Sequence, residues 1–123
     1  MIVILSGILY DATAMEFSYV KFVVYVPVTH ADLVREALAV SGAGKMGMYG
    51  SCSFSTKGVG RFKPMDGAKP FVGEVGKVEE VEEERIETVC SREDLARVME
   101  AVKAAHPYEE PAIDVYPLLN LNG

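Results

Sequence analysis

A short turn near the end of the sequence holds the side chains best suited to chemistry. The string His106-Pro107-Tyr108-Glu109-Glu110-Pro111 places an imidazole, a phenol and two carboxylates beside two prolines. Proline lowers the entropy that is lost when neighbouring groups are held in place. An imidazole beside carboxylates can bind a divalent metal ion or act with them as an acid–base pair. The alternative is structural, with His106 bonded to the backbone and the two glutamates facing solvent.

We therefore predict that this turn contacts a ligand, whose identity the sequence does not specify. The predicted contacts are His106, Tyr108, Glu109 and Glu110, together with Cys52 from the middle of the chain. If the ligand is a divalent metal ion, the predicted metal ligands are His106 and Glu110. Cys52 would join them only if the fold brings it within metal-bond distance, about 2–2.5 Å, of the same ion.

The two cysteines, Cys52 and Cys90, do not form a C-x-x-C pair, which is the usual spacing of zinc and redox sites. A chain of 123 residues can bury a core without disulfides, so we expect reduced thiols in a cytoplasmic protein. A small buried hydrophobe is the commoner role of a lone cysteine. The second histidine, His30, has no obvious partner in the sequence.

Two further patterns resemble nucleotide-binding or catalytic motifs, but their context argues against them. Residues 42–47 match G-x-G-x-x-G letter for letter. That fingerprint requires a strand before it and a helix after it, whereas here it follows a predicted helix. Ser51, Ser53 and Ser55 lie in no G-x-S-x-G elbow, which gives nucleophilic catalysis little support. These patterns favour a binding protein over an enzyme.

The composition limits the kind of partner. Twelve basic residues against eighteen acidic ones give a net charge of −6. This balance opposes a phosphate backbone, so we expect no nucleic-acid partner, whereas cationic partners or metal ions suit it. A hydrophobic fraction of 50% in 123 residues is typical of one globular domain. The apolar run at residues 1–10 is too short to span a bilayer, so we expect no membrane partner.

The pattern of apolar residues predicts the elements that position the turn. Strands are expected at about residues 20–26, 51–62, 78–90 and 112–116. Helices are expected after Thr29 and after Ser91, each of which would be an N-cap. The order β-α-β-β-α-β predicts an α+β fold of the ferredoxin-like kind, with a four-stranded antiparallel sheet and two helices on one face. Because residues 20–26 are apolar on both sides, we expect another copy of the chain to cover the opposite face.

Nine of the eleven glycines lie in the middle of the chain, between Gly42 and Gly76. Gly58 and Gly60 are expected to interrupt the second strand, because glycine within a strand often marks a bulge or a close backbone approach. The connection that follows is too long for a tight hairpin and is the predicted functional loop. The glutamates of residues 79–87 are typical of a strand whose end projects into water.

Residues 1–19 are predicted to form an extension outside a single domain at residues 20–123. A nearly uniform apolar run is followed by Ala12, Thr13 and Ala14, and a second methionine, Met15, stands shortly before the first predicted strand. An upstream start codon would account for such an extension. An added edge strand and a signal peptide are the alternatives, although the charged segment that begins a signal peptide is missing.

Three stretches carry a family resemblance: residues 52–64 (CSFSTKGVGRFKP), 73–88 (GEVGKVEEVEEERIET) and 106–118 (HPYEEPAIDVYPL). Together they resemble the inserted domain of the Ngg-interacting-factor-three-like (YqfO-like) proteins, also called dinuclear metal centre or GTP cyclohydrolase type 2 homologues. The turn at residues 106–111 is also similar to the equivalent turn of CutA, the divalent-cation-tolerance protein. The resemblance implies a PII/CutA-like version of the ferredoxin-like fold and a homotrimer.

In that family the dinuclear metal site belongs to the flanking domains and not to the insert. The resemblance therefore implies a free-standing copy of the inserted module, without the hydrolase or cyclohydrolase activity that the family name suggests. We expect a non-catalytic, oligomeric binding or regulatory module. The alternatives are a small metal-binding protein or metal-dependent enzyme built on His106 and Glu110, and a protein-interaction module that docks through the uncovered sheet face or the acidic third strand.

Overall fold

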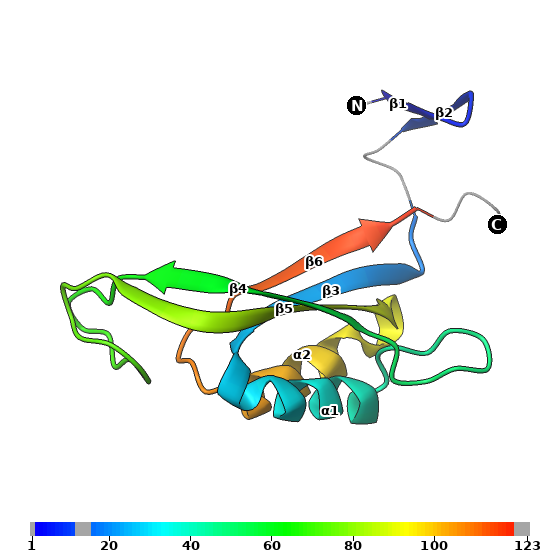
Figure 1. Cartoon of the computed structure of the whole chain (residues 1–123). Helices are drawn as coiled ribbons and strands as arrows, with labels where there is room; N and C mark the ends of the chain where they lie inside the picture. Colours follow the sequence, from blue (N-terminus) through cyan, green and yellow to red (C-terminus); the bar gives the residue numbers. More distant parts are fainter. Residues whose placement is uncertain (1, 12–15, 120–123) are drawn as a thin grey trace.

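The computed structural model describes residues 2–11 and 16–119 and contains two separate sheets. Strands β1 (Ile2–Leu5) and β2 (Ile8–Asp11) form an antiparallel hairpin, which turns at Ser6 and Gly7 with positive φ values of 52° and 75°. The hairpin pairs with no strand of the larger sheet among the described residues, so it is not an added edge strand. Figure 1 shows it at the amino-terminal end of the chain.

The larger sheet has four antiparallel strands in the order β4-β5-β3-β6. Its elements are β3 (Tyr19–Pro27), α1 (Ala31–Ser41), β4 (Phe54–Phe62), β5 (Glu79–Ser91), α2 (Leu95–Ala105) and β6 (Ile113–Leu118). Both helices lie under one face of the sheet (Figure 1). The predicted βαββαβ order and the ferredoxin-like architecture are confirmed. No helix in the described ranges is long and apolar enough to cross a membrane.

The core lies between this sheet and the two helices. Every second residue of β3 points into it, as the alternation of a strand requires, and Ile86 and Cys90 of β5 join them. The helices supply one apolar stripe each, with period 3.6. The largest contributors are Val20, Phe22, Val24, Val26, Val34, Leu38, Val98 and Val102. Cys90 is therefore a buried hydrophobe, and burial raises the pKa of its thiol.

The sheet face without helices is partly covered by side chains of the chain itself. Val23 points toward this face, yet it is 0% exposed. On the neighbouring strand, Arg85 donates hydrogen bonds to the Tyr25 hydroxyl (3.0 Å) and to the Glu87 carboxylate (3.1 Å), and Glu87 is the cross-strand partner of Val23. Side chains of the same chain thus cover Val23, and coverage of the rest of this face by another copy of the chain stays a prediction.

Two local predictions were wrong and one is confirmed. Thr29 does not cap α1, because a short 3-10 helix (Val28–His30) comes first and the hydroxyl of Thr29 bonds to the ring of His30 at 2.8 Å. Gly58 and Gly60 do not interrupt strand β4, which is continuous and pairs along its whole length with the acidic part of β5. Ser91 does cap the second helical segment, since its hydroxyl accepts a hydrogen bond from the Asp94 N–H at 3.2 Å.

Candidate functional site

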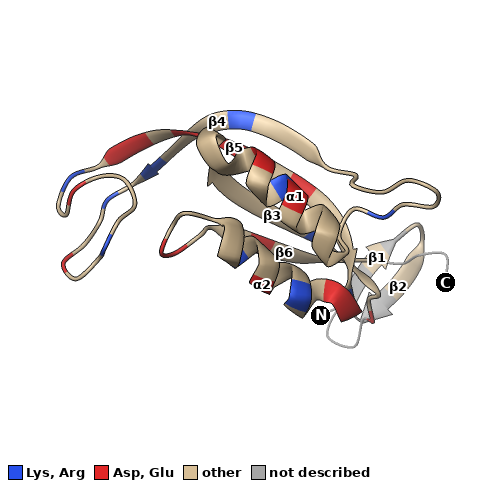
Figure 2. Ribbon diagram, turned by 90° about the horizontal axis from the view of Figure 1, so that it is seen from below, with Lys and Arg blue, Asp and Glu red and all other residues tan. Residues whose placement is uncertain are grey.

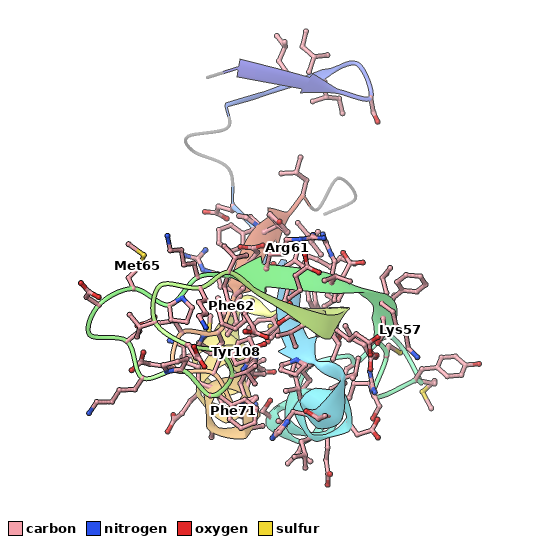
Figure 3. The ribbon with its side chains drawn as sticks, turned by 60° about the vertical axis from the view of Figure 1, so that its left-hand side comes forward. Lys57, Arg61, Phe62, Met65, Phe71 and Tyr108 are labelled. Atoms are coloured by element: carbon pink, nitrogen blue, oxygen red, sulfur yellow. The ribbon has the colours of Figure 1, made fainter. Side chains whose placement is uncertain are left out.

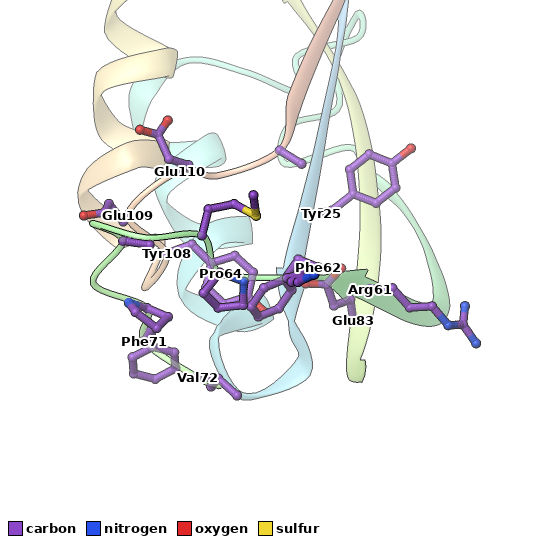
Figure 4. Close-up of a pocket in the computed structure, with 16 residues that line it drawn as sticks. Tyr25, Arg61, Phe62, Pro64, Phe71, Val72, Glu83, Tyr108, Glu109 and Glu110 are labelled. Carbon is purple, nitrogen blue, oxygen red and sulfur yellow. The ribbon is translucent and has the colours of Figure 1, made fainter. Parts of the chain in front are cut away.

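A cavity of about 580 Å³ lies where the long β4–β5 connection, residues 63–78, folds back against the turn after α2. Two hydrogen bonds hold this arrangement. The Gly76 N–H donates to the Pro64 carbonyl at 2.8 Å, which closes the connection into a loop. The Lys69 N–H donates to a Glu109 carboxylate oxygen at 3.3 Å, which joins the loop to the turn. The predicted functional loop and the predicted ligand-binding turn therefore form one site (Figures 3 and 4).

Tyr108 is the centre of the aromatic cluster that lines this cavity, and we call the space the Tyr108 cavity. The ring centroid of Tyr108 lies 5.5 Å from Phe62, 6.5 Å from Phe71 and 5.1 Å from His106. Phe71 also meets the His30 ring edge-on at 5.5 Å, so His30 has a partner that the sequence did not reveal. These separations are typical of favourable aromatic pairs. The cluster connects β4, the loop and the turn.

The rest of the lining is mostly apolar, with a few polar groups at defined places. A volume of about 580 Å³ falls within the usual range for small-molecule sites, roughly 300–1,000 Å³. The apolar lining includes Pro64, Met65, Ala68, Pro70, Val72 and Ala112, and the polar lining includes Tyr25, Arg61, Lys63, Glu83, Glu109 and Glu110. An apolar body with few polar contacts is the ligand type that such a lining accommodates.

Glu83 of β5 is the one buried carboxylate in this lining, with 9% of its surface exposed. It lies across the strand from Gly58, and its carboxylate occupies the space beside Gly60 where a larger residue would have its Cβ. Gly60 is therefore required for the position of Glu83. By contrast, a Cβ at Gly58 would meet no atom within 4 Å. Among the described residues Glu83 forms no ion pair, whereas its neighbour Glu84 is bound by Arg35 at 2.7 Å.

The Tyr108 hydroxyl is also buried, and no residue in the described ranges offers it a hydrogen bond of good geometry. Burial, and then the neighbouring Glu83 carboxylate, raise the pKa of Tyr108, so the phenol stays protonated at neutral pH. A buried polar group without a partner is uncommon in folded proteins and requires an explanation. Glu83 and the hydroxyl of Tyr108 together place an acceptor and a donor beside the cavity.

His106 uses both ring nitrogens inside the protein. Its Nε2–H donates to the Tyr25 carbonyl at 2.7 Å, and its Nδ1 accepts the Tyr108 N–H at 3.1 Å. Burial lowers the pKa of His106, which favours the neutral ring that this pair of bonds requires. His106 thus fixes the end of β3 to the turn and orients Tyr108.

This arrangement predicts how stability depends on pH. Since the pKa of His106 in the folded state lies below the ordinary value of 6.5, the unfolded chain takes up the proton first as pH falls. Stability is therefore complete above pH 6.5 and decreases as pH falls through the folded-state pKa. Urea unfolding from pH 7.5 down to pH 5.5, roughly one unit either side of the ordinary pKa of 6.5, would show this loss. A His106→Gln variant, which has no titrating ring there, would lose less stability over the same range. Parallel curves for both proteins would contradict the assignment.

The residues predicted to bind metal do not form a metal centre in the described part of the chain. No group of three His, Cys, Asp or Glu side chains lies close enough to hold an ion there. Cys52 comes just before Phe54, the first residue of β4, whereas the cavity lies at Phe62, the last residue of that strand. Its carbonyl accepts the Thr88 hydroxyl at 2.6 Å, so it does not join His106. Glu109 and Glu110 are exposed at the rim of the cavity. Metal binding at His106 and Glu110 stays a prediction.

Sequence reasoning found the turn and missed the residues that face it. Glu83 was hidden in a run of glutamates that is typical of a solvated strand, and Phe62 and Phe71 carry no motif. The available signal was Gly60, because glycine within a strand often marks a close approach, although Gly58 in the same strand has no such neighbour. Figure 2 shows the acidic segment of β5 beside β4, where that approach takes place.

The chain is similar in sequence to part of several known proteins. No family model matches the chain. The GTP cyclohydrolase 1 type 2 homolog of Halalkalibacterium halodurans is 52% identical over 103 residues, which are 84% of this chain and 28% of that protein. The protein of the same name from Bacillus subtilis is 51% identical over 98 residues, or 80% of this chain and 26% of the relative. The chain is thus homologous to one segment, 26–28% of the length, of these GTP cyclohydrolase 1 type 2 homologs of the NIF3/YqfO family.

Its fold is shared with solved structures of two kinds. A Bacillus cereus protein related to NIF3 matches 89% of this chain and 29% of its own, with a TM-score of 0.74 and 46% identity. The periplasmic divalent cation tolerance protein CutA from Archaeoglobus fulgidus matches with a TM-score of 0.60 at 20% identity, which shows the fold alone. The resemblance to the NIF3/YqfO family and the PII/CutA-like fold are therefore confirmed. This chain spans only 26–28% of these two curated NIF3/YqfO relatives.

Proposed function

We propose that this NIF3/YqfO homologue is a non-catalytic binding or regulatory module whose small ligand occupies the Tyr108 cavity. One observation carries the proposal: the buried Tyr108 hydroxyl has no hydrogen-bond partner of good geometry in the described residues, and it lies with the Glu83 carboxylate beside an apolar cavity of ligand size. A bound molecule would satisfy both groups and bury the aromatic surface around them. The described residues contain no second cavity in which a buried polar group without a hydrogen-bond partner meets a lining of this apolar kind.

The names of the relatives do not supply the activity. A GTP cyclohydrolase 1 type 2 homolog is about four times as long as the segment that matches this chain, so its chemistry is not assigned to this segment. The name of CutA refers to divalent cations, and a metal site at His106 and Glu110 is the second candidate. The Tyr108 cavity is the better-supported site, because His106 already spends both ring nitrogens on protein bonds.

The experiment that tests the proposal compares an open and a filled cavity. Ala68 lines the Tyr108 cavity, whereas Ala104 lies on the exposed side of α2. We expect aromatic and aliphatic small molecules to raise the melting temperature of the wild-type protein and of Ala104→Trp, but not that of Ala68→Trp, whose indole fills the cavity. The chain contains no tryptophan, so each variant also carries a single fluorescent reporter. Equal ligand responses in the two variants would contradict a ligand site in this cavity.

The module is proposed to assemble as a homo-oligomer, with a trimer favoured by the PII/CutA-like fold. Rings on the sheet face without helices support this assembly: Tyr19, Phe54 and Tyr116 are 50%, 66% and 47% exposed. Exposed aromatic rings gathered on one face are typical of an interface. Sedimentation equilibrium measures the mass directly, and a monomer at micromolar concentration would refute the proposal.

We propose a cytoplasmic location because neither cysteine forms a disulfide. Cys52 and Cys90 are both free thiols, and they lie in different parts of the fold. Free thiols persist in reducing compartments, where disulfides are rare. Fractionation of cells that express a tagged copy of the chain would test this, and recovery outside the cytoplasm would contradict it.

A further inference from the structure

The buried Glu83 carboxylate narrows the class of ligand that the Tyr108 cavity accepts. A buried carboxylate is costly unless a cation or several donors pair with it. The arginines near it in the sheet are already committed: Arg61 binds Glu80 at 3.1 Å, and Arg85 binds Glu87 at the same distance. In the described part of the chain, Glu83 is thus left with the Tyr108 hydroxyl as its polar neighbour. The sources of positive charge that remain are a bound cation and the exposed Lys63 at the rim of the cavity.

The rings around Glu83 favour a cation for an independent reason. Phe62, Phe71 and Tyr108 line the cavity, together with Tyr25, whose ring already has the Arg85 guanidinium over it at 5.6 Å from the ring centroid. The face of an aromatic ring attracts ammonium and guanidinium groups, and the attraction is stronger where water is excluded. An organic cation in this cavity is therefore attracted by two kinds of group, the acidic side chain of Glu83 and the faces of the aromatic rings.

The charged residues that line the cavity also favour a cation over an anion. Three lining residues are acidic (Glu83, Glu109 and Glu110) and two are basic (Arg61 and Lys63). The side chain of Arg61 is 62% exposed and extends away from the other lining residues in Figure 4. With a net charge of −6, the chain as a whole also attracts cations over anions.

We propose that the Tyr108 cavity binds a small organic cation, in which an apolar or aromatic body lies against Phe62, Phe71 and Pro64 while an ammonium-type group pairs with Glu83. This inference rests on the proposed function, because it presupposes that the cavity holds a ligand. The Tyr108 hydroxyl orients the charged group by hydrogen bonding beside Glu83. Arg61 stays paired with Glu80 at the rim of the cavity and takes no part.

The test uses three probes with one phenylethyl body and different charges: phenethylammonium, phenethyl alcohol and hydrocinnamate. We expect the purified wild-type protein to bind the cation at least tenfold more tightly than the alcohol in a calorimetric titration, and to bind the anion weakest. A tenfold ratio is about 1.4 kcal/mol. In Glu83→Gln the cation is expected to lose this preference while the alcohol still binds. The exposed neighbour gives the control, Glu82→Gln, which keeps the preference.

A second pair of variants moves Glu83 without replacing it. The methyl group of Gly60→Ala occupies the space of the Glu83 carboxylate and must displace that flexible side chain, whereas Gly58→Ala meets nothing within 4 Å. Both glycines lie in β4, two positions apart, so the change in backbone entropy is matched. We expect Gly60→Ala to lose the preference for the cation and Gly58→Ala to keep it.

The outcomes separate this inference from the proposed function. Binding of all three probes with equal affinity, or tightest binding of hydrocinnamate, would overturn the cation proposal and leave a binding module in place. A preference for the cation that survives both Glu83→Gln and Gly60→Ala would also overturn it, because the charge would be recognised elsewhere. Failure of all three probes to bind at millimolar concentration would overturn the cation proposal and the ligand cavity together.

Discussion

Replacing Tyr108 by alanine is expected to destabilise the protein by about 2–4 kcal/mol, as truncation of a large, partly buried ring does. The ring contacts Phe62, Phe71 and His106, so its loss removes the packing that holds the loop of residues 63–78 against the turn. The variant should also be cut by trypsin within that loop, which carries Lys63, Lys69 and Lys77. Urea unfolding and limited proteolysis measure the two effects.

Tyr108→Phe is the matched control, because it keeps the ring and removes only the hydroxyl. Since this hydroxyl has no hydrogen-bond partner in the described residues, its removal should change the stability by less than about 1 kcal/mol. The loop should stay resistant to trypsin. If the alanine variant were as stable and as resistant as the phenylalanine variant, the aromatic cluster would not be what holds the loop in place.

Replacing Glu83 by glutamine is expected to stabilise the ligand-free protein by about 1 kcal/mol, since the substitution removes, at nearly constant shape, the charge of a largely buried side chain that forms no ion pair in the described residues. The exposed neighbour Glu82 provides the control, because Glu82→Gln should change the stability by no more than about 0.5 kcal/mol. The urea midpoint should rise in Glu83→Gln with an unchanged slope. A lower midpoint would mean that the carboxylate stabilises the folded chain and does not await a ligand.

The two effects have opposite signs, and together they describe how the site is built. The ring of Tyr108 is expected to increase the free energy of unfolding, while the charge of Glu83 is expected to decrease it. Such conflicts between stability and local chemistry are expected at functional sites. A ligand that pairs with Glu83 would remove this destabilisation, so the free energy of unfolding should increase as the site is filled.

The architecture could be predicted from the sequence because each element carries its own local signal. The alternation of apolar residues in β3, the helical stripe that includes Val98 and Val102, and the Ser91 cap depend on residues near one another in the chain. The order of these elements then allowed few topologies. Thr29 failed as a cap because a 3-10 turn was inserted before α1, and the sequence contains no signal for that choice.

The site was only half predictable, because its two halves depend on different kinds of information. The turn at His106–Pro111 was visible as an unusual local string, and the structure places Tyr108 at the centre of the aromatic cluster that lines the cavity. Glu83 and Phe71 could not be found in this way, since their roles arise from a cross-strand register and from the path of a long loop. Cys52 was grouped with the turn on chemical grounds, although it comes just before the first residue of β4 and the cavity lies at the last residue of that strand.

The most direct test of the central claim is a methyl NMR titration of protein labelled at its methionines. Met65 lines the Tyr108 cavity, whereas Met46 and Met48 lie in the exposed loop after α1 and serve as internal controls. On addition of phenethylammonium, we predict a saturable shift of the Met65 methyl signal while the signals of Met46 and Met48 stay in place. No shift at Met65 under saturating probe, or equal shifts at all three methyl groups, would contradict a ligand site in this cavity.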